Sequence, residues 1–178
     1  MKLLKLEKVH HGKYLKSYEL TYENKSGREK KYEIVSRREL NDITEIGKYT
    51  SGVSIVATMG DKMLLLREFR MGVGRFIYNL CAGMIEQDES LEECISRELY
   101  EETGLHVKNI SYFGSQPWPH SGSLLFGFYC DLDGDNHITL QESELSVGTW
   151  IERSSLPVQP NTLSLTSTLM ESFRNGAI

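Results

Sequence analysis

Several residue types and patterns are scarce in this chain, and each scarcity excludes a class of protein. The three cysteines show neither C-x-x-C spacing nor the pairing of zinc ligands, which excludes a disulfide scaffold and a zinc finger. We expect Cys81, Cys94 and Cys130 to be reduced, buried thiols. No apolar run approaches the roughly 20 residues that cross a bilayer, and the first residues carry too much charge for a signal peptide. We therefore expect a cytoplasmic location and no membrane partner.

The remaining composition is that of an ordinary folded domain with an uneven charge. Its apolar and charged fractions are 39% and 25%, and 178 residues suffice for one main core and an appendage. Residues 1–48 carry 12 Lys/Arg and 8 Asp/Glu, a net of +4, and residues 49–178 carry 8 and 17, a net of −9, which together give −5. The basic segment could cover an anionic substrate or face a partner subunit. A solvated pair of surface strands explains the same pattern.

The first 47 residues predict a β appendage. Two alternating stretches, KSYELTYE and EKKYEIVSR, flank the turn-forming residues 24–27 and predict an antiparallel β-hairpin. A hairpin is not stable alone, so we expect it to pack on another element and to serve in a homodimer contact or as a cover over the substrate. Residues 48–178 are expected to form the main domain.

In the main domain the pattern changes from strands to a helix and back. Strands are predicted over 53–58, 62–69 and 74–79, a helix over 90–103, strands over 110–115, 123–131 and 146–151, and a last helix over 163–174. Gly104 is expected to end the first helix in the left-handed conformation. Glu92 and Glu93 are expected in its first turn, where the helix dipole favours negative charge. This order predicts an α/β (α+β) fold with a mixed β-sheet sandwiched between helices.

The predicted helix 90–103 carries three carboxylates on its apolar side. With Glu98 at zero and about 100° per residue, Glu102 falls at about 40° and Glu101 at about −60°, on the side of the apolar stripe. Neighbouring carboxylates that are withdrawn from water repel one another and need a cation. Oxygen ligands without His or Cys suit Mg²⁺ or Mn²⁺. An acidic helix end that faces solvent is the alternative.

The segment around this helix resembles the Nudix box. Residues 83–105, GMIEQDESLEECISRELYEETGL, match Gx5Ex7REUxEExGU (U is aliphatic) at nine defined positions: Gly83, Glu89, Arg97, Glu98, Leu99, Glu101, Glu102, Gly104 and Leu105. We expect Gly83 to let the loop turn tightly into the helix and Arg97 to hold an acid such as Glu89. The resemblance implies a Nudix fold with catalytic Arg97, and two or more Mg²⁺ (or Mn²⁺) ions held by Glu98, Glu101, Glu102 and the carbonyl of Ala82.

Two flanking segments are similar to those of ADP-ribose and ADP-sugar pyrophosphatases. In LLLREFRMGVGRFIYNLCAG, residues 64–83, the resemblance implies that Arg70, with Arg67 on the same strand, reaches the substrate diphosphate; an Arg that caps a surface strand is the alternative. QESELSVGTWI, residues 141–151, resembles the loop in which these enzymes place a further acid. Glu144 matches that acid best and would serve as a metal ligand or proton acceptor. Glu142 is the next best match and would contact the substrate. The alternative is a charged loop tip.

A third segment points to a neighbouring subfamily. SQPWP at 115–119 resembles the start of the SQPWPFPxS signature of NADH pyrophosphatases, but residues 120–122 depart from it, and the cysteines of that subfamily's zinc ribbon are missing. Trp118 either stacks on a base or fills the core. Pro119 also lies near a proline of ADP-ribose pyrophosphatases, so the motif supports a dinucleotide or ADP-sugar ligand without choosing between them.

Together the resemblances imply a pyrophosphohydrolase that cleaves ADP-ribose, or a related nucleoside diphosphate sugar, to a nucleoside monophosphate and a sugar phosphate. NADH pyrophosphatase is the nearest alternative, followed by hydrolysis of nucleoside triphosphates or capped RNA. The acidic main domain argues against a nucleic-acid partner. A non-catalytic module that senses nucleotide sugars is disfavoured, because such a module can lose box carboxylates and here all are present.

Overall fold

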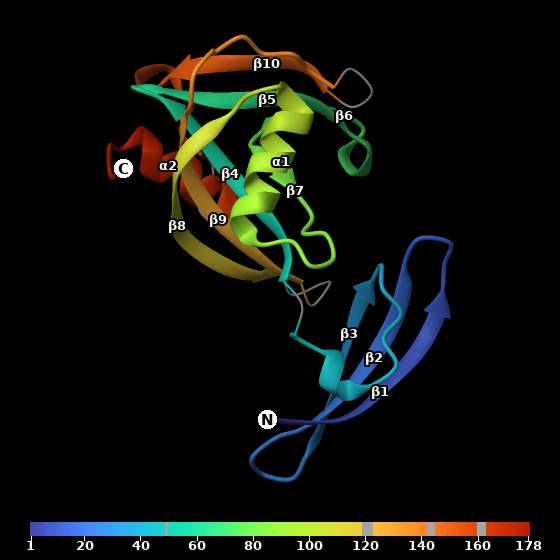
Figure 1. Cartoon of the computed structure of the whole chain (residues 1–178). Coiled ribbons are helices and arrows are strands. Elements are labelled where there is room, and N and C mark those ends of the chain that lie inside the picture. Colours follow the sequence, from blue (N-terminus) through green and yellow to red (C-terminus); the bar gives the residue numbers. More distant parts are fainter. Residues whose placement is uncertain (49, 119–122, 142–144, 160–162) are drawn as a thin grey trace. The chain divides into compact units, whose positions relative to one another are not determined.

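The computed structural model describes residues 1–48, 50–118, 123–141, 145–159 and 163–178 (Figure 1). The chain divides into two compact units. The first comprises Met1–Ser51 with Pro117–Leu124, and the second comprises Gly52–Gln116 with Leu125–Ile178. Within the described ranges, no helix is long and apolar enough to cross a membrane.

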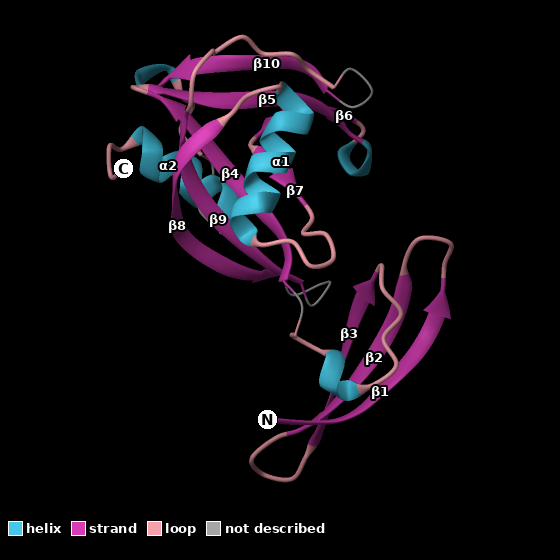
Figure 2. Cartoon of the chain, viewed as in Figure 1, coloured by secondary structure: helices cyan, strands magenta, loops and turns pink. Residues whose placement is uncertain are grey.

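The first unit is a three-stranded antiparallel sheet in the order β1–β2–β3 (Lys2–His11, Lys16–Glu23, Glu29–Ser36; Figure 2). Strands β2 and β3 are the predicted hairpin. The side chain of Asn24 closes their turn by accepting hydrogen bonds from the N–H groups of Ser26 at 2.9 Å and Arg28 at 3.0 Å. Strand β1 was not predicted. Its register with β2 shifts twice, which breaks the alternation that marks a strand.

The hairpin packs on elements of its own chain. Tyr18, Leu20 and Ile34 are buried, and partly buried side chains from β1 and from the segment after β3 pack against them. The Tyr18 hydroxyl accepts a hydrogen bond from the N–H of Leu40 at 2.9 Å, which fixes that segment. The expectation that the hairpin packs on another element is therefore confirmed, and this packing does not itself require a second subunit.

The second unit is built on a seven-stranded sheet (Figure 1). The main path runs β10–β5–β4–β9–β8 (Leu145–Glu152, Lys62–Arg70, Thr50–Met59, Ser123–Leu132, Val107–Trp118). Strand β6 (Arg75–Asn79) pairs with β5, and the three-residue strand β7 (Cys81–Gly83) pairs with β4. Strand β7 was not predicted, because three residues are too few to show an alternating pattern.

Two helices, α1 (Leu91–Thr103) and α2 (Leu165–Arg174), belong to two separate cores. Alternate residues of β4 divide between these cores: Val53, Ile55 and Ala57 pack with α1, and Val56 packs with α2. Each fully buried Leu or Ile contributes roughly 1.5–3 kcal/mol, so the two cores together fix both helices on the sheet. The predicted sandwich of a mixed sheet between helices is confirmed.

Candidate active site

The site is built on helix α1, whose two ends are fixed by local sequence. The Ser90 hydroxyl accepts a hydrogen bond from the N–H of Glu93 at 3.2 Å, and the Glu93 carboxylate accepts one from the N–H of Ser90 at 2.9 Å. Gly104 has a φ of 71° and donates its N–H to the carbonyl of Tyr100 at 2.8 Å. Both predicted helix ends are confirmed. They fix where the helix begins and ends, while its buried residues Cys94, Ile95 and Leu99 set which way its carboxylates point.

The helix places the three predicted carboxylates in different surroundings. The side chain of Glu98 is 14% exposed, Glu102 is half-buried, and the side chain of Glu101 is 56% exposed. The expectation that all three lie on the buried side is therefore wrong for Glu101. At about −60° from Glu98, its side chain reaches the solvent border of the helix.

The carboxylate of Glu98 packs directly over Gly83 of β7. A Cβ atom on Gly83 would lie 1.8 Å from Cδ and 1.9 Å from Oε1 of Glu98. Gly83 is not among the glycines with positive φ, so its backbone conformation is open to other residues. The expected role in a tight turn is thus wrong. Glycine is required at this position because the carboxylate occupies the space that a side chain would fill.

Two residues before Gly83, Cys81 faces the same helix. Residues 81 and 83 of a strand share one face, and Cys81 is buried in the core beneath α1. Burial and then the charge of Glu102 raise the pKa of this thiol well above its ordinary value. The free, buried thiol expected from the sequence is confirmed.

Arg97 joins the loop before the helix to the carboxylates. Its Nε and Nη2 donate to the two oxygens of Glu89 at 2.7 and 2.9 Å, and Nη2 also donates to the carbonyl of Met84 at 3.0 Å. The predicted pairing of Arg97 with Glu89 is confirmed, and it lowers the pKa of Glu89 to about 2. Nη1 donates to Glu98 at 2.9 Å and to Glu101 at 3.2 Å. The guanidinium therefore both shapes the loop and orients the Glu98 carboxylate.

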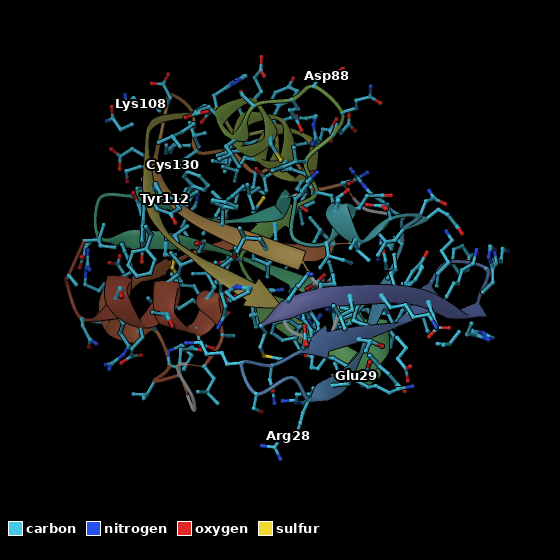
Figure 3. The ribbon with its side chains drawn as sticks, turned by 90° about the horizontal axis from the view of Figure 1, so that it is seen from below. Arg28, Glu29, Asp88, Lys108, Tyr112 and Cys130 are labelled. Carbon is cyan, nitrogen blue, oxygen red and sulfur yellow. The ribbon has the colours of Figure 1, made fainter. Side chains whose placement is uncertain are left out.

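The loop held by Arg97 has a strained tip. Asp88 has a φ of 63°, in the left-handed region that residues other than glycine seldom adopt, and Figure 3 labels it on the segment that leads into α1. Asp tolerates this conformation better than most residues. Arg97 holds both ends of this loop, because it donates to Glu89 after the tip and to the carbonyl of Met84 before it.

A divalent cation fits this arrangement chemically. The carboxylates of Glu98 and Glu102 and the carbonyl of Ala82, which lies between Cys81 and Gly83, are oxygen ligands of the kind that Mg²⁺ prefers. Gly83 leaves room for the Glu98 carboxylate at the strand. Over the residues with described positions, no three His, Cys, Asp or Glu side chains already form a closed metal-binding group. Glu144 and Glu142, the acids expected from the later loop, lie outside those residues.

Strand β5 presents its two candidate arginines to opposite faces of the sheet. Alternation places Arg70 on the face that packs with α1, where its Nη1 lies 3.2 Å from Oε1 of Glu68 and its side chain is 57% exposed. Arg67 points to the other face, with its guanidinium carbon 4.1 Å from the ring centroid of Phe76. The structure therefore brings Arg70, and not Arg67, to the face that carries the box carboxylates.

The SQPWP segment lies at the end of β8. Trp118 is 44% exposed, so its ring does not fill the core, while Pro119 lies outside the described residues. Gln116 clamps the start of α2: its amide donates to the carbonyl of Leu163 at 2.5 Å, and its Oε1 accepts from the N–H of Leu165 at 2.6 Å. The sequence shows the motif but does not reveal that its glutamine binds the residues at the start of α2.

Comparison with known proteins agrees with this geometry. The family model of the NUDIX domain matches residues 48–169. The NAD-capped RNA hydrolase NudC of Pseudomonas fluorescens (strain Pf0-1) is 34% identical over 132 residues, covering 74% of this chain and 47% of that protein. The enzyme of the same name from Vibrio parahaemolyticus is 38% identical over 120 residues, covering 66% and 44%. The chain thus spans about half the length of the curated relatives it matches.

A solved structure resembles nearly the whole chain. The crystal structure of an ADP compounds hydrolase superimposes with a TM-score of 0.74 at 19% identity, covering 98% of this chain and 92% of that one. At this identity the likeness concerns the fold. The sheet between two helices, the complete box and the matching family model define the class, and the chain belongs to the Nudix family. The predicted family is therefore confirmed.

Proposed function

We propose that this chain is a pyrophosphohydrolase, dependent on Mg²⁺ or Mn²⁺, that cleaves the diphosphate of ADP-ribose or a related nucleoside diphosphate sugar. The products would be a nucleoside monophosphate and a sugar phosphate. The observation behind the proposal is the packing of the Glu98 carboxylate against β7 at Gly83, next to Ala82, with Glu102 one turn further along the same helix. Nudix hydrolases generally use divalent cations, and an all-oxygen ligand set suits Mg²⁺.

Each residue in the site has a distinct task in this proposal. A bound cation would neutralise the diphosphate and make water a better nucleophile. Glu98, Glu102 and the Ala82 carbonyl would hold it, and Glu101 would join them only after turning from its solvent-facing position. Arg97 keeps Glu98 in place through its bond at 2.9 Å. Arg70, on the same face, would bind a phosphate oxygen pair through its planar guanidinium.

Further residues would accept a proton or contact the substrate. Glu144, or a box glutamate, would accept the proton of the attacking water. Glu142 and Trp118 would contact the substrate, and the exposure of Trp118 suits stacking on a base. Arg67 would contribute only from the opposite face, which makes it the weakest of these candidates.

A second candidate substrate is an NAD-type dinucleotide, free or at the end of an RNA. Relatives at 34% and 38% identity are named NAD-capped RNA hydrolases, and the chain carries SQPWP. RNA is therefore retained as a partner to be tested, although the net charge of residues 49–178 disfavours it. A sensor without catalysis is the third candidate, disfavoured by the complete box.

We also propose that the protein is a homodimer. Residues 1–47 would contact the second subunit or cover its substrate, and residues 48–178 would form the catalytic domain. A cytoplasmic setting agrees with three free, buried cysteines. Light scattering at micromolar concentration tests the dimer, and a monomer would refute it.

Product analysis by liquid chromatography separates the candidates. The protein is incubated with Mg²⁺ and ADP-ribose, NADH, GDP-mannose, a diadenosine polyphosphate, dGTP or an NAD-capped RNA, and kcat/KM is compared. The proposal expects ADP-ribose or another nucleotide sugar to be the best substrate. Preference for NADH or the capped RNA would favour the second candidate, and binding without turnover would favour the sensor.

A further inference from the structure

The last turn of helix α1 is bound by a segment that lies far from it in the sequence. The last carbonyl groups of a helix have no partner within the helix, and helix ends fray. In α1 the carbonyl of Thr103 accepts a hydrogen bond from the N–H of Thr139 at 2.9 Å. The carbonyl of Glu102 accepts one from the N–H of Gln141 at 3.2 Å. Both donors belong to residues 138–141, the strap, which lies between β9 and β10 (Figure 1).

The strap is also bound to strand β10. The side chains of Ile138 and Leu140 pack over Gly148, where a Cβ atom would lie 2.9 Å from a methyl carbon of each. Both side chains also pack against the core beneath α1. The carbonyl of Gln141 accepts a hydrogen bond from the N–H of Leu145, the first residue of β10, at 3.2 Å. The strap therefore joins the last turn of α1 to β10 by backbone hydrogen bonds and by packing.

Through β10 the strap connects the last turn of α1 with strand β5. Strand β10 pairs with β5, and Gly148 stands opposite Leu66 in this pairing. Arg70 lies further along β5, on the face that packs with α1. Glu102 and Arg70 are therefore connected through hydrogen-bonded backbone, although they belong to different elements.

We propose that the strap is a positioning element of the metal site, which keeps Glu102 in place by holding the last turn of α1. The proposal rests on the metal site of the proposed function. Glu102 is the last residue but one of α1, so it lies in the turn that unwinds first when a helix frays. Unwinding would carry its carboxylate away from Glu98 and from the carbonyl of Ala82. Groups that orient metal ligands from outside typically contribute 10–100-fold to metal affinity or activity, and we expect about tenfold here.

Gly148→Ala perturbs the strap without changing α1. The three atoms nearest to the added Cβ all belong to Ile138 and Leu140, and the closest two would lie at 2.9 Å, whereas carbon atoms in contact are about 3.5–4.0 Å apart. Gly148 is not among the glycines with positive φ, so alanine suits its backbone. Gly127→Ala is the matched control, because a Cβ there would crowd two leucines of α2 instead, at 3.0 and 3.1 Å.

The first measurement is Mn²⁺ binding by electron paramagnetic resonance on the full chain, together with melting temperatures. We expect Gly148→Ala to raise the Mn²⁺ dissociation constant about tenfold. Adding Ile138→Ala removes one of the two crowded methyl groups and leaves only the flexible end of Leu140 to turn aside, so the double variant should regain most of the affinity. Gly127→Ala should bind Mn²⁺ like the wild type at a similar loss of melting temperature.

The second measurement is amide hydrogen exchange of the wild type, followed by NMR with and without Mg²⁺. Coupling is reciprocal: if release of the strap weakens metal binding by some factor, bound metal suppresses that release by the same factor. Saturating Mg²⁺ should therefore slow exchange of the Thr139 and Gln141 amides about tenfold. The amide of Asn175 donates to the carbonyl of Glu171 at 3.0 Å in the last turn of α2, and its exchange should not change.

Three results would overturn the positioning role. They are wild-type Mn²⁺ affinity in Gly148→Ala, an equal loss of affinity in Gly127→Ala, and exchange of the Thr139 and Gln141 amides that does not respond to Mg²⁺. The exchange result decides the question even if Gly148→Ala does not fold. A wild type that bound no Mn²⁺ would overturn both this role and the proposed metal site. If the expected couplings were found but the wild type hydrolysed none of the diphosphates, the proposed reaction would fail and the positioning role would be supported.

Discussion

Replacing Gly83 with alanine perturbs the site by an amount that the structure defines. The new Cβ would lie 1.8 Å from Cδ of Glu98, whereas two carbon atoms in contact are separated by about 3.5–4.0 Å. The carboxylate must therefore retreat by roughly 2 Å. A misplacement of about 1 Å at a catalytic group can cost about 10²-fold in rate, so we expect kcat to fall by at least about 10²-fold. Stability should change little, because the displaced group is the end of a flexible side chain.

Steady-state kinetics and thermal melts of Gly83→Ala test this reasoning. Gly114→Ala is the matched control, because Gly114 lies in another strand of the same sheet and a Cβ there would meet no atom within 4 Å. The control should keep the wild-type kcat. Gly83→Ala should melt within about 4 °C of the wild type, which for a domain of this size corresponds to about 1 kcal/mol. Wild-type kcat and Mg²⁺ affinity in Gly83→Ala would refute the assigned position of Glu98.

Two further predictions concern Arg70 and the Glu89–Arg97 pair. Arg70→Ala should raise KM for ADP-ribose more than it lowers kcat, and Arg70→Lys should restore part of the affinity; an unchanged KM with a lower melting temperature would make Arg70 structural. The folded-state pKa of Glu89, about 2, lies below the ordinary 4.5, so its pairing stabilises the fold above pH 4.5 and loses effect as the pH falls toward 2. Glu89→Gln should cost about 2 kcal/mol at pH 7 and progressively less between pH 4.5 and 2, as measured by urea unfolding; a cost independent of pH would contradict this.

The fold could be predicted where one local rule determined an element. Ser90 and Gly104 fix the ends of α1 through capping and a left-handed residue, and periodicity located the longer strands. Strand β1 escaped because its register shifts break the alternation, and β7 because it is short. The hairpin is covered by residues that are distant from it in the sequence, as in the hydrogen bond between Tyr18 and Leu40. Periodicity does not predict such contacts.

The sequence predicted which residues form the site, but only part of their geometry. The box spacing identified Glu98, Glu102 and the Arg97–Glu89 pair. It did not show that Glu101 faces solvent, because a phase of about 60° lies at the border of a helix face. Alternation along β5 could have separated Arg67 from Arg70. The packing of the Glu98 carboxylate over Gly83 could not be predicted before β7 was recognised as a strand that packs under α1.

The most direct test of the central claim follows ADP-ribose by phosphorus NMR in the presence of Mg²⁺. The account predicts that the two diphosphate signals are replaced by two monoester signals, from a nucleoside monophosphate and a sugar phosphate. It predicts no conversion in EDTA and a rate lower by on the order of 10² in Glu102→Gln. Unchanged diphosphate signals with the wild type, or equal rates in EDTA or in Glu102→Gln, would contradict the claim that these carboxylates hold a cation for diphosphate hydrolysis.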